Sequence, residues 1–194
     1  MSKKILILNG HPDAASRGLC HALAEAYAAG ASTAGHDVER IDVAALQFGF
    51  LRSMIEFERG TPPPDIAAAQ QSIRRAEHVV VIFPLWLGDM PAILKAFFEQ
   101  ALRPGFAFTN RPRGLPEMHL TGRSARVVVT MGMPAFVYRW YFRAHGLKNL
   151  KRNILRFVGF SPVRDTVLGS VATHDKQGIE RWLEEMKVLG GRAR

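Results

Sequence analysis

Apolar runs separated by amphipathic segments dominate the hydrophobic pattern of this chain. The runs "KILIL" (4–8), "HVVVIFP" (78–84) and "RVVVT" (126–130) are continuous, which is typical of strands buried on both faces of a parallel sheet. The run "VERIDV" (38–43) is weaker and edge-like, and "VRDTVLGSV" (163–171) indicates a fainter strand. We therefore expect five strands.

Apolar residues at helical spacing occupy the intervals between these runs. A segment rich in aromatic and basic residues, 136–158, predicts one or two helices broken near Gly146, and a last helix is expected from about Gly178 to Leu189. Three further helical stripes are Leu19, Leu23, Tyr27 and Ala31; Ile66, Ala69, Ile73 and Ala76; and Leu94, Phe97, Phe98 and Ala101, the last after Pro91. The alternation predicts an α/β fold, a doubly wound five-stranded parallel sheet with helices on both faces and right-handed crossovers.

Residues 1–194 are expected to form a single domain, because this length supports one well-buried core and the chain shows neither an internal repeat nor a linker. Two segments, 46–64 and 103–122, are long connections for a compact domain, and such connections are often lids or binding loops. They contain the phenylalanines Phe48, Phe50, Phe57, Phe106 and Phe108.

The composition is that of a soluble globular protein, with 47% hydrophobic and 22% charged residues. No apolar run approaches the roughly 20 residues of a membrane span, and the first residues lack the pattern of a signal peptide. A cytoplasmic location is therefore expected. The single cysteine, Cys20, cannot form an internal disulfide, and we interpret it as a small buried helix residue.

The formal net charge is +9, which raises the question of an anionic partner. The basic residues are scattered, apart from a run between Arg139 and Arg156, and no nucleic-acid motif accompanies them, so no nucleic-acid partner is expected. The run is interpreted as a solvated helix face, with attraction of an anionic dinucleotide or of a membrane surface as alternatives. The seven histidines lack metal-ligand spacing, so no metal site is expected.

The stretch "NGHPDAASRGLC" (9–20) lies where the first strand is expected to end and a helix to begin near Ser16. Ligands of open α/β sheets bind beyond the carboxyl ends of the strands, and a helix N-terminus favours phosphate. His11, Ser16 and Arg17 offer hydrogen-bond donors, and Gly18 permits close approach of the backbone. The alternative is that Ser16 is only a helix cap and His11 a turn residue. The stretch matches neither G-x-G-x-x-G nor G-x-x-x-x-G-K-[ST], so neither a Rossmann dehydrogenase nor a nucleoside triphosphatase is indicated.

Two further strand exits strengthen the ligand-binding interpretation. "PLWLGDMPAILKAFFEQ" (84–100) presents an aromatic residue, Trp86, ahead of a helix, and "TMGMP" (130–134) places a glycine turn after the next buried strand. An aromatic loop, a glycine turn and a phosphate site at one sheet edge describe a slot for a flat ring with a phosphorylated tail. A flavin has this shape.

Over about its whole length the chain resembles the flavodoxin-like NAD(P)H:quinone oxidoreductases, through "GHPDAAS", "FPLWLGDMPAILKAFFEQALRPGFAF" and "ILRFVGF". The resemblance implies a flavin phosphate site at His11, Ser16, Arg17 and Gly18; a loop lining the isoalloxazine at Pro84, Leu85, Trp86 and Leu87; and a turn at its pyrimidine edge at Thr130, Met131, Gly132 and Met133. The family commonly has Thr-Thr-Gly-Gly where this chain has Thr-Met-Gly-Met. Tyr138 and His145 lie near the positions of the family's catalytic tyrosine and histidine, with a spacing that differs by one residue.

The resemblance implies two-electron hydride transfer from NAD(P)H through FMN or FAD to a quinone or another flat acceptor. It also implies a homodimer in which Phe106, Phe108 and 136–142 line pockets across the interface, the alternative being that these aromatics only pack. Three other functions are weighed: an azo or nitroaromatic reductase, a flavin-binding ancillary subunit of a membrane transporter, and a flavodoxin-type electron carrier. The basic charge argues against the electron carrier, because such carriers are typically acidic.

Overall fold

The structure, a computed structural model, describes residues 2–15 and 17–194. Its centre is a five-stranded parallel sheet in the order β2-β1-β3-β6-β7, in which Ile5 of β1 pairs with His78 of β3. The strands are β1 (Lys4–Asn9), β2 (Asp37–Asp42), β3 (His78–Pro84), β6 (Ser124–Thr130) and β7 (Val163–Leu168). The predicted doubly wound α/β fold is confirmed: β2 is added on one side of β1, and β3, β6 and β7 are added on the other side, so the strand order reverses between β1 and β3.

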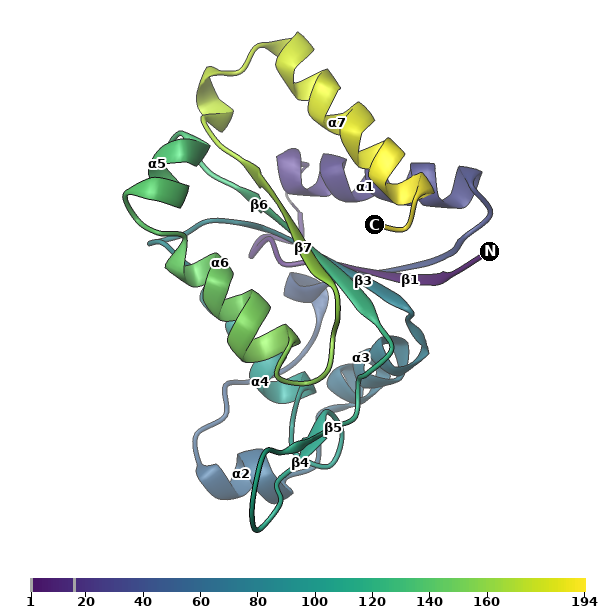
Figure 1. The fold of residues 1–194 in the computed structure, drawn as a ribbon, viewed down its shortest axis with the longest axis vertical. Coiled ribbons are helices and arrows are strands. Elements are labelled where there is room, and N and C mark those ends of the chain that lie inside the picture. The colour runs from purple at the N-terminus through teal and green to yellow at the C-terminus, as the bar shows by residue number, and fades with distance from the viewer. Residues whose placement is uncertain (1, 16) are drawn as a thin grey trace.

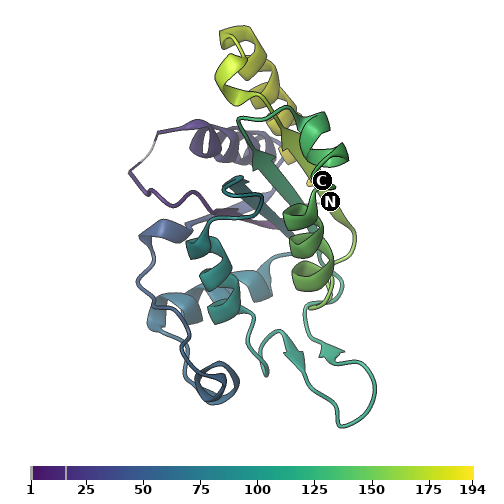
Figure 2. The same cartoon turned by 90° about the vertical axis from the view of Figure 1, so that its left-hand side faces the viewer.

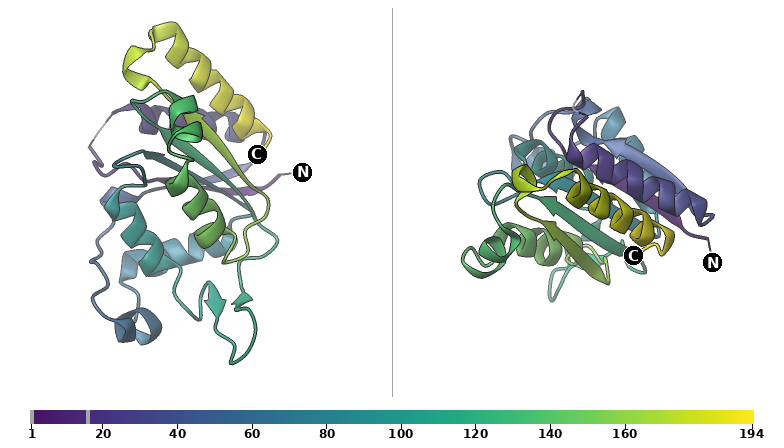
Figure 3. Two further views of the ribbon diagram at one scale, coloured as in Figure 1. Left: turned by 60° about the vertical axis from the view of Figure 1, so that its left-hand side comes forward. Right: turned by 90° about the horizontal axis from the view of Figure 1, so that it is seen from above.

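Helices cover both faces of this sheet (Figure 1). The helices α1 (Leu19–Thr33) and α7 (Lys176–Gly191) lie on one face and run side by side, as the view from above in Figure 3 shows. The other face carries α3 (Pro64–Arg75), α4 (Ala92–Ala101) and α6 (His145–Asn149). Within residues 2–15 and 17–194, none of the helices is both long and apolar enough to cross a membrane.

The two faces are packed in different ways. Between α1 and α7 the backbones nearly touch: a Cβ at Gly30 would lie 2.6 Å from the Cα of Lys187, and one at Gly190 would lie 3.0 Å from the amide nitrogen of Ala31. The opposite face is filled by large side chains, among them the fully buried Phe97 and Leu94 of α4. Continuous burial of the central strands between these layers explains their unbroken apolar runs.

Both long connections contain short elements. The first contains η1 (Val43–Ala45) and α2 (Met54–Arg59), whose first turn is capped by the hydroxyl of Ser53 accepting from the Glu56 amide at 3.1 Å. The buried Arg103 guanidinium donates to the carbonyls of Glu56 and Gly60 and so holds this connection in place. The second contains an antiparallel hairpin of β4 (Phe108–Thr109) and β5 (Glu117–Met118), which projects from the molecule in Figure 2.

The break expected near Gly146 is confirmed, but it lies just before Gly146 and not at the glycine itself. The segment forms α5 (Ala135–Trp140), then α6, which continues into a π-helical turn, η2 (Leu150–Leu155). The interruption is at Arg143 and Ala144, whose φ angles are +53° and +49°. Gly146 lies inside α6, because a Cβ there would lie 2.8 Å from the Cα of Asp89 and overlap the carbonyl oxygen of Gly88. Its small size therefore serves packing between segments and not a helix end.

The last strand and helix differ slightly from their predicted bounds. β7 ends at Leu168, three residues before the predicted end, and η3 (Val171–Thr173) follows it. The turn between them includes Ser170, whose φ of +57° is incompatible with a continuing strand. α7 begins two residues early, where the carboxylate of Asp175 accepts from the Gly178 amide at 2.8 Å.

Candidate functional site

The candidate site lies at the carboxyl ends of β1, β3 and β6, three neighbouring strands. Their exits are the loop 10–18, the turn 85–91 and the loop 131–134. The exits of β3 and β6 are joined directly, because the Leu85 amide donates to the Thr130 carbonyl at 2.8 Å. The structure therefore brings the three predicted segments to one edge of the sheet.

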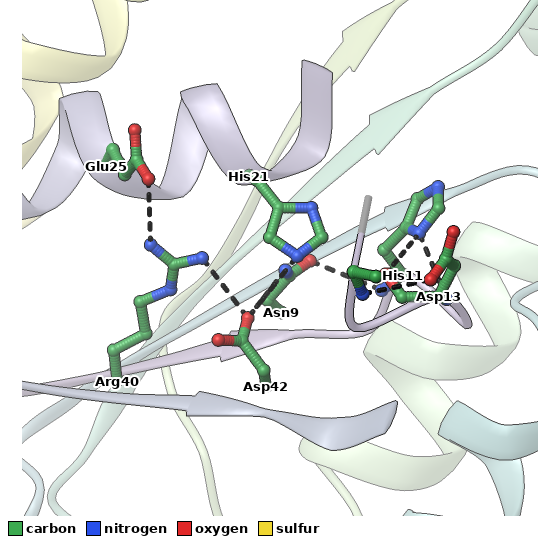
Figure 4. A network of polar contacts seen from close by, with 8 residues as sticks. Asn9, His11, Asp13, His21, Glu25, Arg40 and Asp42 are labelled. Atoms are coloured by element: carbon green, nitrogen blue, oxygen red, sulfur yellow. Dashed lines mark hydrogen bonds and ion pairs between the residues drawn. The ribbon is translucent and has the colours of Figure 1, made fainter. Parts of the chain in front are cut away.

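A network of polar side chains shapes the exit of β1 (Figure 4). The buried Asn9 amide donates to Oδ1 of Asp42 at 2.7 Å, and its Oδ1 accepts from the His11 backbone amide at 3.3 Å. Nδ1 of His11 accepts from the Asp13 amide at 3.2 Å, and the Asp13 carboxylate accepts from the Ala15 amide at 2.9 Å. His11 thus holds the loop through its ring nitrogen.

The loop leads into α1, which begins at Leu19 with Gly18 as its N-cap. The predicted start near Ser16 was three residues early, and Ser16 itself lies outside the described residues. Arg17 and Gly18 are exposed in front of the helix. The first amides of a helix have no acceptor within the helix, and the positive end of its dipole lies here, so these residues can hold an anionic group.

The exit of β3 is a tight backbone turn. The amides and carbonyls of Trp86 and Asp89 exchange hydrogen bonds of 2.9 and 3.0 Å around Leu87 and Gly88, whose φ angles of +48° and +86° are those of a type I′ turn. The Asp89 carboxylate caps the next segment by accepting from the Met90 amide at 2.7 Å. Trp86 is 53% exposed and Leu87 fully exposed, so both offer apolar surface to a ligand.

At the exit of β6, the side chains of Thr130 and Met131 are buried, whereas the next residue, Gly132, faces open space. The Thr130 hydroxyl lies 3.4 Å from the sulfur of Cys20 in α1, and the side chain of Met131 is buried. Gly132 is exposed, with nothing within 4 Å of a Cβ built on it. Of the predicted turn, Thr130 and Met131 therefore offer only backbone at this edge. Cys20 is buried in α1, which confirms the prediction of a small buried helix residue, and this burial raises the pKa of its thiol to about 11.

The two predicted catalytic residues lie at a corner beside the site. Tyr138 is buried, its hydroxyl accepts from the Leu147 amide at 3.1 Å, and burial raises its pKa. This hydrogen bond joins α5 to α6, and a catalytic role of Tyr138 stays a prediction. His145 is exposed at the first residue of α6, and the structure records no contact between it and Tyr138. The aromatics Phe106 and Phe108 are also buried within the chain, as their packing interpretation expects.

Sequence reasoning missed a polar hollow of about 430 Å³ beside α1. His21 is 7% exposed, and both of its ring nitrogens lack a hydrogen-bond partner among the described residues. Its Nε2 lies 3.7 Å from Asp42, which also pairs with Arg40, and burial lowers its pKa. The hollow is lined by Ala14, Ala15, Arg17, His21, Glu25, Arg40 and Asp42. The one sequence signal for it is Asp42, a carboxylate at the end of a strand.

An open parallel sheet whose strand order reverses between β1 and β3, with a helix N-terminus at that point, defines the doubly wound class of ligand-binding α/β proteins. The chain belongs to the family described as having a flavodoxin-like fold, whose profile matches residues 3–189. This agrees with the resemblance seen in the sequence.

Individual relatives carry related names. NAD(P)H dehydrogenase [quinone] 1 of Rattus norvegicus is 27% identical over 148 residues, which cover 72% of this chain and 53% of that protein. The chain thus spans about half the length of the rat protein. The glutathione-regulated potassium-efflux system ancillary protein KefG of Cronobacter sakazakii is 30% identical over 139 residues, covering 66% of this chain and 72% of KefG.

The fold of this chain is similar to that of solved structures over nearly its whole length. Smu.1420 from Streptococcus mutans is 27% identical with a TM-score of 0.80, covering 97% of this chain and 99% of its own. An NAD(P)H:quinone oxidoreductase from Methanothermobacter marburgensis is 25% identical with a TM-score of 0.81, covering 99% of this chain and 97% of its own.

Proposed function

We propose that this protein is a flavin-dependent NAD(P)H:quinone oxidoreductase that uses FMN. The observation that carries the proposal is the arrangement of the three strand exits, with hydrogen-bond donors at the α1 N-terminus and open apolar surface at Trp86 and Leu87. A flat ring with a phosphorylated tail needs these two kinds of surface side by side. The names of the rat and archaeal relatives support the same activity.

The residues present fit such a cofactor. At Gly88 and Gly132 nothing lies within 4 Å of a Cβ position, so both backbone turns border open space. In the loop before α1, the Asp13 carboxylate is engaged by the Ala15 amide, while Arg17 is exposed beside the helix N-terminus. The Arg17 guanidinium and the first amides of α1 are hydrogen-bond donors, and donors of this kind suit a phosphate.

When bound, a flavin supplies the redox chemistry, in which a hydride enters from the reduced nicotinamide and two electrons leave to the acceptor. The protein binds and orients. Arg17 and the first amides of α1 would hold the phosphate, and Pro84 to Leu87 together with Gly132 would border the ring. The Thr130–Leu85 hydrogen bond fixes the two ring-side exits relative to each other, which favours a fixed ring position.

Binding and turnover can be tested separately. The purified chain is incubated with FMN, FAD or riboflavin, freed of unbound ligand, and examined by visible absorption. We expect FMN to be retained, to bleach anaerobically with NADPH or NADH, and to recover its colour with a quinone. Failure to retain either FMN or FAD would refute the proposal.

Arg17→Ala tests the phosphate site with a matched ligand pair. A charge-assisted hydrogen bond is worth roughly 1.5–3 kcal/mol, so the variant should lose about tenfold or more in FMN affinity. Riboflavin, which lacks the phosphate, should bind both proteins equally. Arg181→Ala, on α7, is the control and should change neither affinity.

Binding and turnover measurements on the purified protein also distinguish two alternative functions. The similarity to KefG favours a flavin-binding ancillary subunit, for which FMN would bind but turnover would be negligible without a transporter. An azo or nitroaromatic reductase would show a higher kcat/KM with those acceptors than with quinones. The family resemblance also supports a homodimer, which sedimentation would test. The cytoplasmic location expected from the composition and the single cysteine would be tested by cell fractionation.

A further inference from the structure

Helix α5 and the two residues after it, Tyr141 and Phe142, expose large aromatic side chains. The rings of Tyr141 and Phe142 contact each other edge to face, with centroids 5.0 Å apart. Phe136 is 71% exposed, Trp140 89% and Tyr141 80%, and Phe142 after the helix is also exposed. Figures 1 and 2 show α5 at an outer corner of the molecule. We call these four residues, with the cations described next, the α5 surface. Clustered exposed aromatics usually mark an interaction site.

The same surface is strongly basic. Residues 135–156 contain six cations and neither Asp nor Glu, so they contribute +6 to a chain of net charge +9. Arg139 and Lys151 pair with Asp165 of β7. The other four are without a carboxylate partner among the described residues: Arg143, Lys148, Arg152 and Arg156. Arg143 also borders the hollow next to Trp140 and Tyr141, so the aromatic and basic parts adjoin.

The α5 surface continues into the candidate site. Helix α5 begins at Ala135, directly after the loop that follows β6. Helix α6 packs on the turn after β3, since a Cβ at Gly146 would lie 2.8 Å from Asp89. The α5 surface is thus joined through α6 to the turn that carries the exposed Trp86 and Leu87.

We propose that the α5 surface docks on an anionic lipid bilayer. Trp and Tyr rings favour the level of the lipid headgroups, and each Lys or Arg near an anionic leaflet adds about 1 kcal/mol of attraction. The resemblance implies a homodimer with 136–142 at its interface, but a second copy fits the α5 surface less well than a bilayer does. A two-fold contact there would bring the same four unpaired cations face to face, so a homodimer would have to use another face. If the proposed function also holds, the consequence is that the acceptor is a quinone dissolved in the membrane.

Vesicle sedimentation tests the docking without any redox readout. The wild-type chain should co-sediment with vesicles containing phosphatidylglycerol, remain in the supernatant with phosphatidylcholine alone, and be released by high salt. Arg143→Glu combined with Arg152→Glu should reduce the partition coefficient about tenfold or more. Arg181→Glu combined with Lys187→Glu changes the net charge equally on α7 and should bind like the wild type.

A variant of an exposed aromatic residue tests whether aromatic side chains insert into the bilayer or whether charge attraction alone binds the protein. Trp140→Ser removes a side chain that is 89% exposed, so folding should be unaffected while vesicle binding weakens. Wild-type binding that is equal on neutral and anionic vesicles, or absent on both, would overturn the proposal. So would loss of a dimer in the Trp140→Ser variant without loss of vesicle binding, because the surface would then be a subunit contact.

The redox proposal is tested independently of the docking. With a water-soluble quinone, the Arg143→Glu/Arg152→Glu variant should keep the wild-type rate. With a long-chain quinone embedded in anionic vesicles, it should be slower than the wild type by about the same factor as its partition coefficient. Normal turnover without vesicle binding would reject docking alone, and vesicle binding without turnover would reject the redox activity alone.

Discussion

The two ends of the parallel sheet are built differently. At the amino end His78 is completely buried, with Nδ1 2.7 Å from the Ser124 hydroxyl, and Arg126 donates to the Arg194 carbonyl at 2.6 Å and to the Thr166 hydroxyl at 2.7 Å. At the carboxyl end Leu87 is fully exposed and Gly132 borders open space. Nε2 of His78 is buried without a hydrogen-bond partner among the described residues. The amino end is therefore closed by burial, whereas the carboxyl end is open to a ligand. The following changes test this division.

The largest effect is expected at the amino end and depends on pH. Burial lowers the pKa of His78 to about 3, whereas in the unfolded chain it is about 6.5. As the pH falls below about 6.5, His78 is protonated in the unfolded chain but stays neutral in the folded protein. The free energy of unfolding therefore falls, by up to about 4–5 kcal/mol near pH 3. Urea unfolding between pH 7.5 and 4 measures this loss.

His78→Gln should flatten that acid dependence. Comparing the two proteins at pH 7.5 gives the structural cost of the substitution, and the difference in slope below pH 6.5 then isolates the titration. Identical slopes would mean that the folded protein protonates this ring and that the amino end is less closed than the structure indicates.

A smaller loss is expected from the support of the turn after β3. Gly146→Ala places a methyl group 2.8 Å from the Cα of Asp89, and overpacking of this kind costs about 2 kcal/mol. The turn must shift, so FMN affinity should fall together with the free energy of unfolding. Gly49→Ala, where a Cβ meets nothing within 4 Å, is the control and should stay within about 0.5 kcal/mol. An unchanged Gly146→Ala protein would show that α6 does not hold the turn.

The loop after β1 should respond to loss of its buried amide. Asn9→Ala removes the donor to Asp42 and the acceptor for the His11 amide, which we expect to cost about 1–2 kcal/mol of stability. FMN should bind more weakly while riboflavin binding changes less, because the loop bears on the phosphate. Asn153→Ala removes an exposed amide bonded to Asn149 and serves as the comparison. Equal losses for both flavins would place the effect outside the phosphate site.

The smallest effect has the opposite sign. Leu87 has a φ of +48°, a conformation that Asn tolerates better than Leu, so Leu87→Asn should stabilise the protein by up to about 1 kcal/mol. The exposed apolar side chain would be lost, and we therefore expect a higher KM for the quinone. A gain in stability with unchanged kinetics would show that this side chain does not contact the acceptor. Thermal unfolding and initial rates provide the two measurements.

The local sequence pattern was sufficient to predict the sheet and the meeting of three strand exits at one edge of it. Continuous apolar runs identify β3 and β6 because those strands are buried on both faces, and that burial is written into adjacent residues. The three strand exits could also be placed together, because parallel strands deliver their carboxyl ends to the same edge. The exposed Trp86 and Leu87 were anticipated for the same reason.

Contacts between distant segments were decided only by the tertiary structure. Gly146 has the signature of a helix break, but its size is required by Gly88 and Asp89, nearly 60 residues earlier in the chain. Tyr138 has the position of a catalytic residue, yet its hydroxyl is bonded inside the α5–α6 corner. Asp42 and Asn9 meet because β1 and β2 are adjacent strands. Residue spacing along the chain determines periodic burial, whereas which side chains meet depends on how the elements pack, and that information is not local.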